Sequence, residues 1–338
     1  MNFLSYKSIL ITGGTGSFGQ SMTAYVCKNV KKIKRLVIFS RDELKQYKMQ
    51  EKFPQSKYPF IRYFLGDVRD EKRLTRALNE IDLVIHAAAL KQVPAAEYNP
   101  FEVINTNIIG AQNIIEASLN TNVKKVVALS SDKASSPINL YGATKLCSDK
   151  LFIAANNYVK DRKVSFSIVR YGNVMGSRGS VIPHFLKQKE TGILKITDKE
   201  MTRFNITMTD SIKLVIWAIN NSYGAEIIVP KIPSYNILDV AKSISKNCKI
   251  EFIGKRPGEK VHEEMIGKEE SINSISTGKY YIILQPNNIG QKKYYFEKFA
   301  SKHLPKNFSY NSKENTKFLS INELKSLIKK SKTIKEEL

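Results

Sequence analysis

Three glycines follow the first apolar run of the chain, and they constrain its fold more than any other feature. The run SILIT spans residues 8–12, and Gly13, Gly16 and Gly19 come after it at a spacing of three. Glycine permits a tight turn, lets main-chain N–H groups approach a pyrophosphate, and allows a helix to pack closely on a strand. The start of the following helix also favours negative charge. The segment therefore predicts a phosphate-binding loop for a dinucleotide. The other residues expected to contact the dinucleotide in this loop are Thr15, Ser17 and Phe18.

Six short apolar runs predict a parallel sheet. Each run is rich in β-branched and aliphatic residues, and helix-like stretches separate the runs. Continuous apolar runs of this kind are typical of strands buried on both faces, and their alternation with helices indicates right-handed βαβ crossovers. The sequence therefore predicts an α/β fold with a doubly wound parallel sheet of the Rossmann type. The predicted strands are 8–12, 35–40, 61–67, 82–88, 125–131 and 165–172.

The regular rhythm of strands and helices ends after about Gly172, and this change predicts a second region. Glycine, proline and basic residues become frequent there, as in GNVMGSRGSVIPH and GKRPGEKVHEEM. Loops above the carboxyl edge of a parallel sheet commonly carry ligand contacts. We expect a dinucleotide-binding domain, a smaller interleaved substrate-binding region and a solvated tail. Their predicted residues are, in that order, 1–172 with 205–240, 173–204 with 241–330, and 331–338.

Charge and cysteine content narrow the class of protein. The 338 residues include 54 Lys and Arg against 31 Asp and Glu, which gives a formal net charge of +23. This charge suits nucleic acid, an anionic membrane or phosphorylated small molecules, but the basic residues are spread along the chain, which does not favour nucleic-acid binding. Three distant cysteines and four histidines predict neither a disulfide framework nor a metal site. No apolar run approaches the roughly 18 residues that cross a bilayer, so we expect a cytoplasmic protein without membrane contact.

The end of the second predicted strand bears on the choice of dinucleotide. A carboxylate at this point would bind the ribose 2′-hydroxyl of NAD, but the strand ends in Ser40 and is followed by Arg41. A hydroxyl and a guanidinium group suit a 2′-phosphate better, which favours NADP. The carboxylates of Asp42 and Glu43 follow immediately, however, and could occupy the same neighbourhood.

Residues after the third and fourth predicted strands are further candidates for cofactor contacts. Asp67 and Val68 are placed to flank an adenine, although Asp67 could equally be an ordinary turn residue. Ala87, Ala88 and Ala89 offer small side chains where the main chain must pass close to the cofactor, or they could simply pack in the strand. Both groups are predicted at the carboxyl edge, where parallel sheets bind their ligands.

The stretch SSDKASSPINLYGATK, residues 130–145, concentrates polar and ionisable groups. Ser131, Asp132 and Lys133 lie at the carboxyl end of the fifth predicted strand, whereas Tyr141 and Lys145 share one face of the next helix at a spacing of four. A neighbouring cation favours phenolate, so Lys145 is expected to lower the pKa of Tyr141 from about 10. Ser131 could then orient a sugar hydroxyl while Tyr141 takes its proton. The alternative is a polar loop in which Asp132 and Lys133 form a solvated ion pair.

The Ser/Tyr-x-x-x-Lys arrangement beside the glycine loop closely resembles the extended short-chain dehydrogenase/reductase family. Within it, the chain resembles the inverting UDP-N-acetylglucosamine 4,6-dehydratases of the pseudaminic acid pathway, and the similarity covers most of the chain. The matching segments, in chain order, are SRDELK, HAAALK, SDK, NLYGATK, RYGNVMGSRGSV and RPGEKVHEEM.

The resemblance implies a reaction for the residues of this stretch. Hydride leaves sugar C4 for the nicotinamide while Tyr141 removes the proton of the 4-hydroxyl. Lys133, as the neutral amine, takes the C5 proton, and Asp132, as the protonated acid, donates to the departing 6-hydroxyl. Hydride then returns to C6, and protonation of C5 from the opposite face inverts that centre. Burial is expected to raise the pKa of Asp132 and to lower that of Lys133, with Lys145 and Lys91 also disfavouring another ammonium group.

The resemblance also indicates residues for the nucleotide sugar. Asn173 could donate its amide to a phosphate or sugar oxygen, or it could serve a turn. Arg203 and Arg256 are candidates for the diphosphate because guanidinium groups match phosphate oxygens, although each alone could be surface charge. Glu259 is a weaker candidate for a ribose hydroxyl. Lys91 completes the predicted substrate contacts.

Asn107 resembles the family asparagine that supports the active-site lysine, although helix capping is a rival role. Two enzymatic alternatives remain: a nucleotide-sugar 4-epimerase, which needs the Tyr–Lys pair but no acid and base for elimination, and a retaining 4,6-dehydratase, for which a carboxylate is expected at the position of Lys133. The non-enzymatic alternative is a dinucleotide-sensing or nucleic-acid-binding protein. The resemblance further implies a homo-oligomer.

Overall fold

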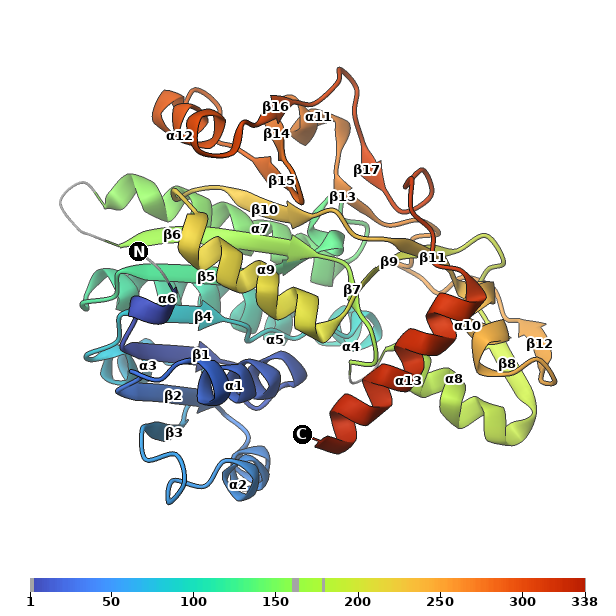
Figure 1. The fold of residues 1–338 in the computed structure, drawn as a ribbon, viewed down its shortest axis with the longest axis horizontal. Helices are drawn as coiled ribbons and strands as arrows, with labels where there is room; N and C mark the ends of the chain where they lie inside the picture. Colours follow the sequence, from blue (N-terminus) through green and yellow to red (C-terminus); the bar gives the residue numbers. More distant parts are fainter. Residues whose placement is uncertain (1–2, 160–163, 178–179, 338) are drawn as a thin grey trace.

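A ten-stranded sheet dominates the computed structural model, which describes residues 3–159, 164–177 and 180–337, except for the side chains of 331–337 (Figure 1). The strand order is β16-β14-β15-β10-β6-β5-β4-β1-β2-β3. Pairing is parallel from β3 through to β10, and antiparallel from β10 to β16. The predicted doubly wound α/β fold is therefore confirmed, with an antiparallel extension at one edge. The strands are β1 (Ser8–Thr12), β2 (Arg35–Ser40), β3 (Ile61–Leu65), β4 (Leu83–His86), β5 (Lys125–Ser131), β6 (Ser165–Tyr171), β10 (Ile227–Pro230), β14 (Ser274–Thr277), β15 (Tyr280–Ile283) and β16 (Lys302–His303).

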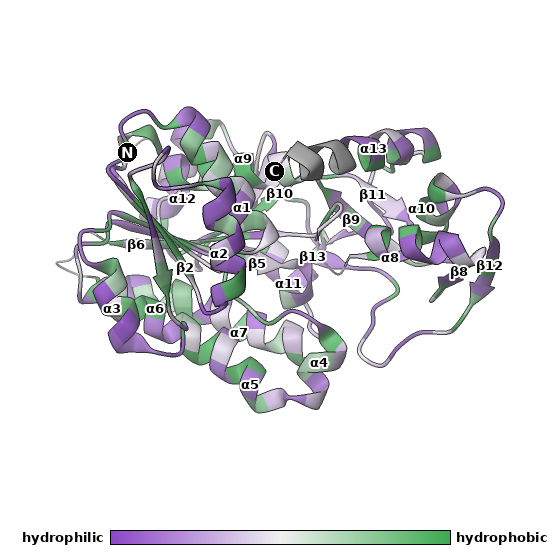
Figure 2. Ribbon diagram, turned by 90° about the horizontal axis from the view of Figure 1, so that it is seen from below, coloured by the Kyte–Doolittle hydropathy of each residue, from purple (hydrophilic) through white to green (hydrophobic). Residues whose placement is uncertain are grey.

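Helices cover both faces of this sheet, and the apolar strands lie between the two layers (Figure 2). Alternate residues of a strand point to opposite faces, so Ile9 and Ile11 pack in one core while Leu10 packs in the other. This two-sided burial explains why the strands read as continuous apolar runs. The helices on one face are α1 (Ser17–Asn29), α9 (Met208–Asn221) and α12 (Ile289–Phe299). Those on the other are α3 (Glu71–Leu78), α6 (Gly110–Leu119) and α7 (Leu140–Ala155).

Smaller sheets and helices form a second region beyond the carboxyl ends of the parallel strands (Figure 1). A third apolar core holds part of it together, with Phe185, Leu194 and Val240 fully or almost fully buried, whereas Met265 and Tyr310 of this region pack in a core of the main sheet. Its strands are β7 (Asn173–Val174), β8 (Ile193–Ile196), β9 (Thr202–Ile206), β11 (Ser234–Asn236), β12 (Lys249–Phe252), β13 (Glu264–Ile266) and β17 (Tyr310–Asn311). Its main helices are α8 (Val181–Gln188), α10 (Ile237–Ile244) and α13 (Ile321–Glu337).

The division of the chain into two regions stays a prediction, but two observations bear on it. Strands β14, β15 and β16 lie within the range predicted for the substrate region, yet they extend the main sheet. Helix α13 continues into the predicted tail as far as Glu337. Within the described ranges, no helix is both long enough and apolar enough to cross a membrane.

Short helices complete the connections near the carboxyl edge of the sheet. Helix α2 follows β2, and the α4, α5 and η2 segments follow β4 in close succession. Residues 178–179 of the segment RYGNVMGSRGSV lie outside the described residues. The bounds are α2 (Glu43–Lys52), α4 (Val93–Tyr98), α5 (Pro100–Ile104), η2 (Asn105–Ile109), η3 (Asp132–Ala134) and α11 (Lys268–Ser271).

Candidate active site

A cavity of about 1220 Å³ lies at the carboxyl edge of the parallel sheet. Its wall is built from the segments that follow β1 to β6, together with β9 and the segment between β12 and β13. Parallel sheets bind ligands at this edge because the loops that leave the strands converge there. With the exception of Asn107, every residue predicted to contact cofactor or substrate lines this one cavity.

The predicted phosphate loop has the geometry that a dinucleotide requires. Gly13 has a φ of +61°, and a Cβ atom there would lie 2.9 Å from the main-chain nitrogen of Ala88. A Cβ atom on Gly19 would lie 2.3 Å from the carbonyl oxygen of Gly14, so glycine is required for helix α1 to pack here. Gly16 precedes α1 and provides no side-chain cap, which leaves the first N–H groups of the helix available to a pyrophosphate. These residues fit a dinucleotide cofactor.

Two cations and two carboxylates line the wall near β2. Arg41 and Lys45 both line the cavity, and Arg41 lies 3.6 Å from Asp67. The carboxylate of Asp42 caps helix α2 by accepting from the Lys45 N–H, and it also pairs with the Lys45 ammonium group. Glu43 is exposed and does not line the cavity. Both carboxylates that could have competed for the ribose are therefore engaged or turned away.

The loop after β4 is held by a buried polar network. The Thr12 hydroxyl accepts hydrogen bonds from the N–H groups of Ala87 and Ala88 at 3.1 and 3.2 Å, and it lies 2.8 Å from Nδ1 of His86. Asn107 bonds both the N–H and the carbonyl oxygen of Leu90 and donates to the Thr144 hydroxyl at 3.0 Å. Asn107 thus joins this loop to helix α7 at the residue before the predicted active-site lysine.

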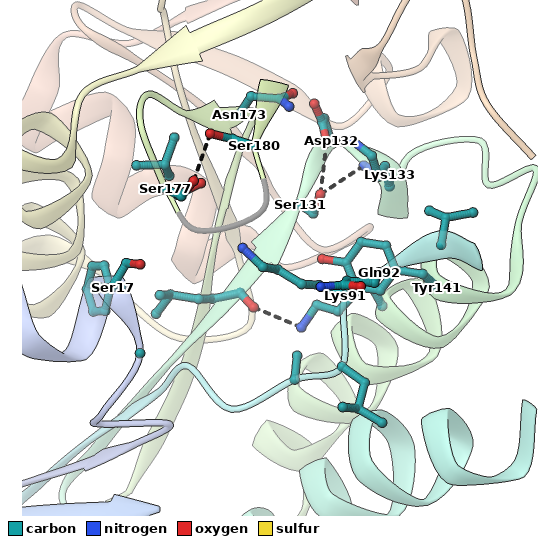
Figure 3. A pocket seen from close by; sticks show the side chains of 18 of the residues that line it. Ser17, Lys91, Gln92, Ser131, Asp132, Lys133, Tyr141, Asn173, Ser177 and Ser180 are labelled. Atoms are coloured by element: carbon teal, nitrogen blue, oxygen red, sulfur yellow. Dashed lines mark hydrogen bonds and ion pairs between the residues drawn. The ribbon is translucent and has the colours of Figure 1, made fainter. Parts of the chain in front are cut away.

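Tyr141 and Ser131 meet at the centre of the cavity wall (Figure 3). Asn139 caps α7 by accepting from the Gly142 N–H at 2.8 Å, which fixes the turn that carries Tyr141. Lys145 donates to the Leu129 carbonyl oxygen at 2.8 Å. The predicted lowering of the Tyr141 pKa is not found: burial raises it to about 12, and the opposing influences are the charge of Lys133 and a hydrogen bond with Ser131. Desolvation outweighs the cationic neighbourhood in this state.

Lys133 lies between two buried carboxylates. Its ammonium group is 3.1 Å from Oδ1 of Asp132 and 3.0 Å from Oε1 of Glu263. The Asp132 side chain is 1% exposed, which excludes the solvated ion pair considered above, and Ser131 donates to it at 2.8 Å. Burial raises the pKa of Asp132, as predicted. The prediction for Lys133 is wrong: burial acts to lower its pKa, but the charges of Asp132 and Glu263 outweigh burial and raise it.

The predicted substrate residues differ in their availability. Arg256 has a side chain that is 64% exposed and pairs with Glu259 at 3.0 Å. Arg203 is almost buried, and its guanidinium group donates to three main-chain carbonyl oxygens at 2.7 to 2.9 Å. Among the described residues, Oδ1 of Asn173 is buried without a hydrogen-bond partner. Burial and the nearby charge of Lys133 lower the pKa of Lys91.

Glu263 is the residue of this site that the sequence did not single out. It lies within the segment RPGEKVHEEM beside Glu264, but only one of these two neighbours reaches the cavity. Glu263 is 2% exposed, whereas Glu264 directs its carboxylate to Ser136 and Ser309. Alternation in the strand pair β13–β17 could have separated the two, but the sequence does not identify that pair.

Comparisons with known proteins agree with this geometry. The sequence profile of the family described as "Polysaccharide biosynthesis protein" matches residues 9–285. The chain is 52% identical, over 82% of its length and 82% of the relative's, to a UDP-N-acetylglucosamine 4,6-dehydratase (inverting) of Campylobacter jejuni subsp. jejuni serotype O:2. It is 43% identical to a UDP-glucose 4-epimerase of Rickettsia bellii, with 98% of both chains covered.

The fold of the chain is also similar to that of a solved structure. The X-ray structure of Pen from Bacillus thuringiensis matches with a TM-score of 0.88 and 39% identity, covering 98% of this chain and 99% of that one. The family profile, the epimerase relative and Pen span both the glycine loop and the Ser131–Lys145 segment. The chain therefore belongs to the polysaccharide biosynthesis protein family and is an extended short-chain dehydrogenase/reductase.

Proposed function

We propose that this chain is a configuration-inverting UDP-N-acetylglucosamine 4,6-dehydratase that uses NADP. One observation carries the proposal: a buried acid, Asp132, and an amine, Lys133, lie together beside Tyr141 in the cavity that also contains the glycine loop. Oxidation of a sugar hydroxyl needs only the tyrosine and the dinucleotide. An additional acid and base serve the elimination of water.

The glycine loop, Ser40 and the alanines after β4 would hold the dinucleotide, which supplies hydride acceptance at sugar C4 and hydride return at C6 when bound. Lys145, which donates to the Leu129 carbonyl oxygen near the end of β5, would contact the nicotinamide end of the dinucleotide. Arg41 would favour NADP over NAD because its half-exposed guanidinium group lines the cavity directly after Ser40, and Lys45 keeps the Asp42 carboxylate engaged.

We assign proton transfers at three atoms to side chains of the cavity, as the resemblance to the 4,6-dehydratases implies. Tyr141 takes the proton of the 4-hydroxyl, with Ser131 orienting that group. The neutral amine of Lys133 takes the C5 proton, and the carboxylic acid of Asp132 donates to the 6-hydroxyl, which leaves as water. The raised pKa of Asp132 favours the protonated form that this donation requires. Protonation of C5 from the opposite face then inverts its configuration.

The substrate end of the cavity suits a nucleotide diphosphate. Arg256 keeps a largely exposed guanidinium group, which makes it the stronger candidate for the diphosphate. Arg203 is committed to main-chain oxygens and to Glu259 and Glu263, so its part would be to shape the wall. The unpartnered oxygen of Asn173 offers an acceptor for a sugar hydroxyl.

Turnover in deuterium oxide tests the proposal. Purified protein is incubated with UDP-N-acetylglucosamine, and the product is analysed by mass spectrometry and proton NMR. We expect a 4-keto sugar that has lost one water and carries deuterium at an inverted C5. Lys133→Ala should abolish deuterium incorporation at C5 and keep the dinucleotide bound, whereas Lys150→Ala, an exposed lysine of α7 outside the cavity, should behave as wild type. Undiminished C5 exchange in Lys133→Ala would remove that residue from the role of base.

A nucleotide-sugar 4-epimerase is the second candidate, because relatives named UDP-glucose 4-epimerase are similar over nearly the whole chain. The same incubation separates the two, since an epimerase product keeps the mass of its substrate. Self-association also remains a proposal from the resemblance, and sedimentation of the purified protein would test it.

A further inference from the structure

The amine of Lys133 has a second anionic neighbour besides the adjacent Asp132. Glu263 approaches it to 3.0 Å from a different part of the chain, and both carboxylates are almost completely buried. Removing both charges from water is costly, and only a close contact between the two groups offsets that cost. Each partner therefore strongly affects whether the other is charged. The proposed reaction needs Lys133 as a neutral amine, and Glu263 opposes that state.

Glu263 is fixed in place through its main chain. Its N–H group donates to the Ser312 hydroxyl at 2.9 Å, and its carbonyl oxygen accepts from the Ser312 N–H at 2.7 Å. The residue directly precedes β13, which pairs antiparallel with β17 and packs against η3, the turn that contains Asp132 and Lys133. The carboxylate therefore has little freedom to follow Lys133 if the lysine moves.

The surroundings of Lys133 contain other charged or titratable groups, and they act in both directions. Asp132 lies on its own turn, Tyr141 on α7 and Tyr235 on β11. Lys91, after β4, and Lys260, before β13, are cationic neighbours. On β9, Arg203 lies 3.8 Å from Glu263 and so shares that carboxylate with Lys133. Among the described residues, Oε2 of Glu263 has no hydrogen-bond partner.

We infer that Glu263 is a positioning residue whose carboxylate holds the Lys133 ammonium group against the cavity wall and controls when it can release its proton. The inference rests on the proposed function. In that reaction, Lys133 first gives a proton to solvent. Its neutral amine then takes the C5 proton, the C5–H electron pair forms the C5–C6 double bond, and the 6-hydroxyl leaves as water with a proton from Asp132.

Removal of the Glu263 charge should shift the acidic limb of the pH profile of the reaction. Glu263→Gln keeps the size of the side chain and removes the anion, so the neutral amine of Lys133 becomes available at lower pH. We expect the acidic limb of the pH profile for C5 deuterium incorporation to move down by about 1 to 3 units. The plateau rate should fall, because the lysine is held less firmly. Glu226→Gln is the matched control, since Glu226 is also fully buried but lies outside the cavity, and its limb should not move.

A direct titration distinguishes this inference from the proposed function. Full-length protein labelled with 15N-lysine is titrated by NMR, and the Lys133 signal is assigned through its loss in Lys133→Ala. A lower Lys133 pKa in Glu263→Gln than in wild type supports the inference even if no dehydrated product forms, in which case only the proposed function fails. An unchanged titration, or a limb that stays in place, shows a merely structural role and overturns the inference. If Glu263→Gln does not fold, Glu263→Asp, which keeps the charge but withdraws it, should shift both readouts in the same direction by less.

Discussion

Stability should fall as the pH falls, and His86 provides the reason. The imidazole ends β4, is 1% exposed, and lies 2.8 Å from the Thr12 hydroxyl that holds the loop after β4. Burial, followed by the charge of Lys145, lowers the pKa of His86 from its ordinary value of 6.5 to about 3. As the pH falls below about 6.5, the imidazole of the unfolded chain becomes protonated whereas that of the folded chain stays neutral. The contribution of His86 to stability is therefore complete above pH 6.5 and is lost as the pH falls toward 3.

The size of this loss follows from the two pKa values. Each pH unit between them costs about 1.4 kcal/mol, so His86 alone should remove about 2 kcal/mol of unfolding free energy between pH 7 and pH 5. Urea denaturation of wild type and His86→Asn at both pH values measures it, since asparagine can retain a hydrogen bond to Thr12 without the titration. The variant should lose about 2 kcal/mol less than wild type over this interval.

A control separates this histidine from the others. His303 is exposed, so His303→Asn should show the same pH dependence as wild type. Equal losses in wild type and His86→Asn would refute the reasoning, because they would mean that the buried imidazole does not stay neutral in the folded chain.

Three further variants test other parts of the structure. The double variant Arg41→Ala/Lys45→Ala should weaken NADP binding relative to NAD binding by about 30-fold, because each of the two half-exposed cations contributes about 1 kcal/mol. Calorimetric titration with both dinucleotides measures the two affinities. Lys48→Ala, which lies outside the cavity, should leave their ratio unchanged. Arg170→Met should lower the unfolding free energy, measured by urea denaturation, by about 3–5 kcal/mol, because the carboxylates that pair with this fully buried guanidinium group would lose their partner. A loss below about 1 kcal/mol would contradict a stabilising role for this buried network. Tyr141→Phe should reduce turnover by about 10²- to 10⁴-fold while the dinucleotide still binds, as measured by product formation, and near-normal turnover would exclude the phenol as base.

The sequence predicted the sheet because its strands are apolar on both faces, a pattern that few other structures require. It also predicted which side chains share the cavity, since residues that leave parallel strands at their carboxyl ends must converge. Ser131, Asp132 and Lys133 illustrate this, because their place at the carboxyl end of β5 is enough to bring them to the edge.

The charge state of the site could not be predicted in the same way. The charges of Asp132 and then Glu263 raise the pKa of Lys133, and Glu263 approaches through the pairing of β13 with β17, two short strands without a periodic signal. The raised pKa of Tyr141 likewise depends on the depth of burial, which a helical spacing of four does not reveal. The antiparallel strands β14 and β15 were not predicted, because they follow an irregular segment in which strands and helices do not alternate regularly.

The bonds between Glu263 and Ser312 have a practical consequence for protein engineering. A chimera whose crossover falls between residues 263 and 312 would take Glu263 from one relative and Ser312 from another, and so would divide both contacts between the two parents. Because the main-chain support of Glu263 would then depend on a serine from a different parent, crossover points should lie before residue 263 or after residue 312.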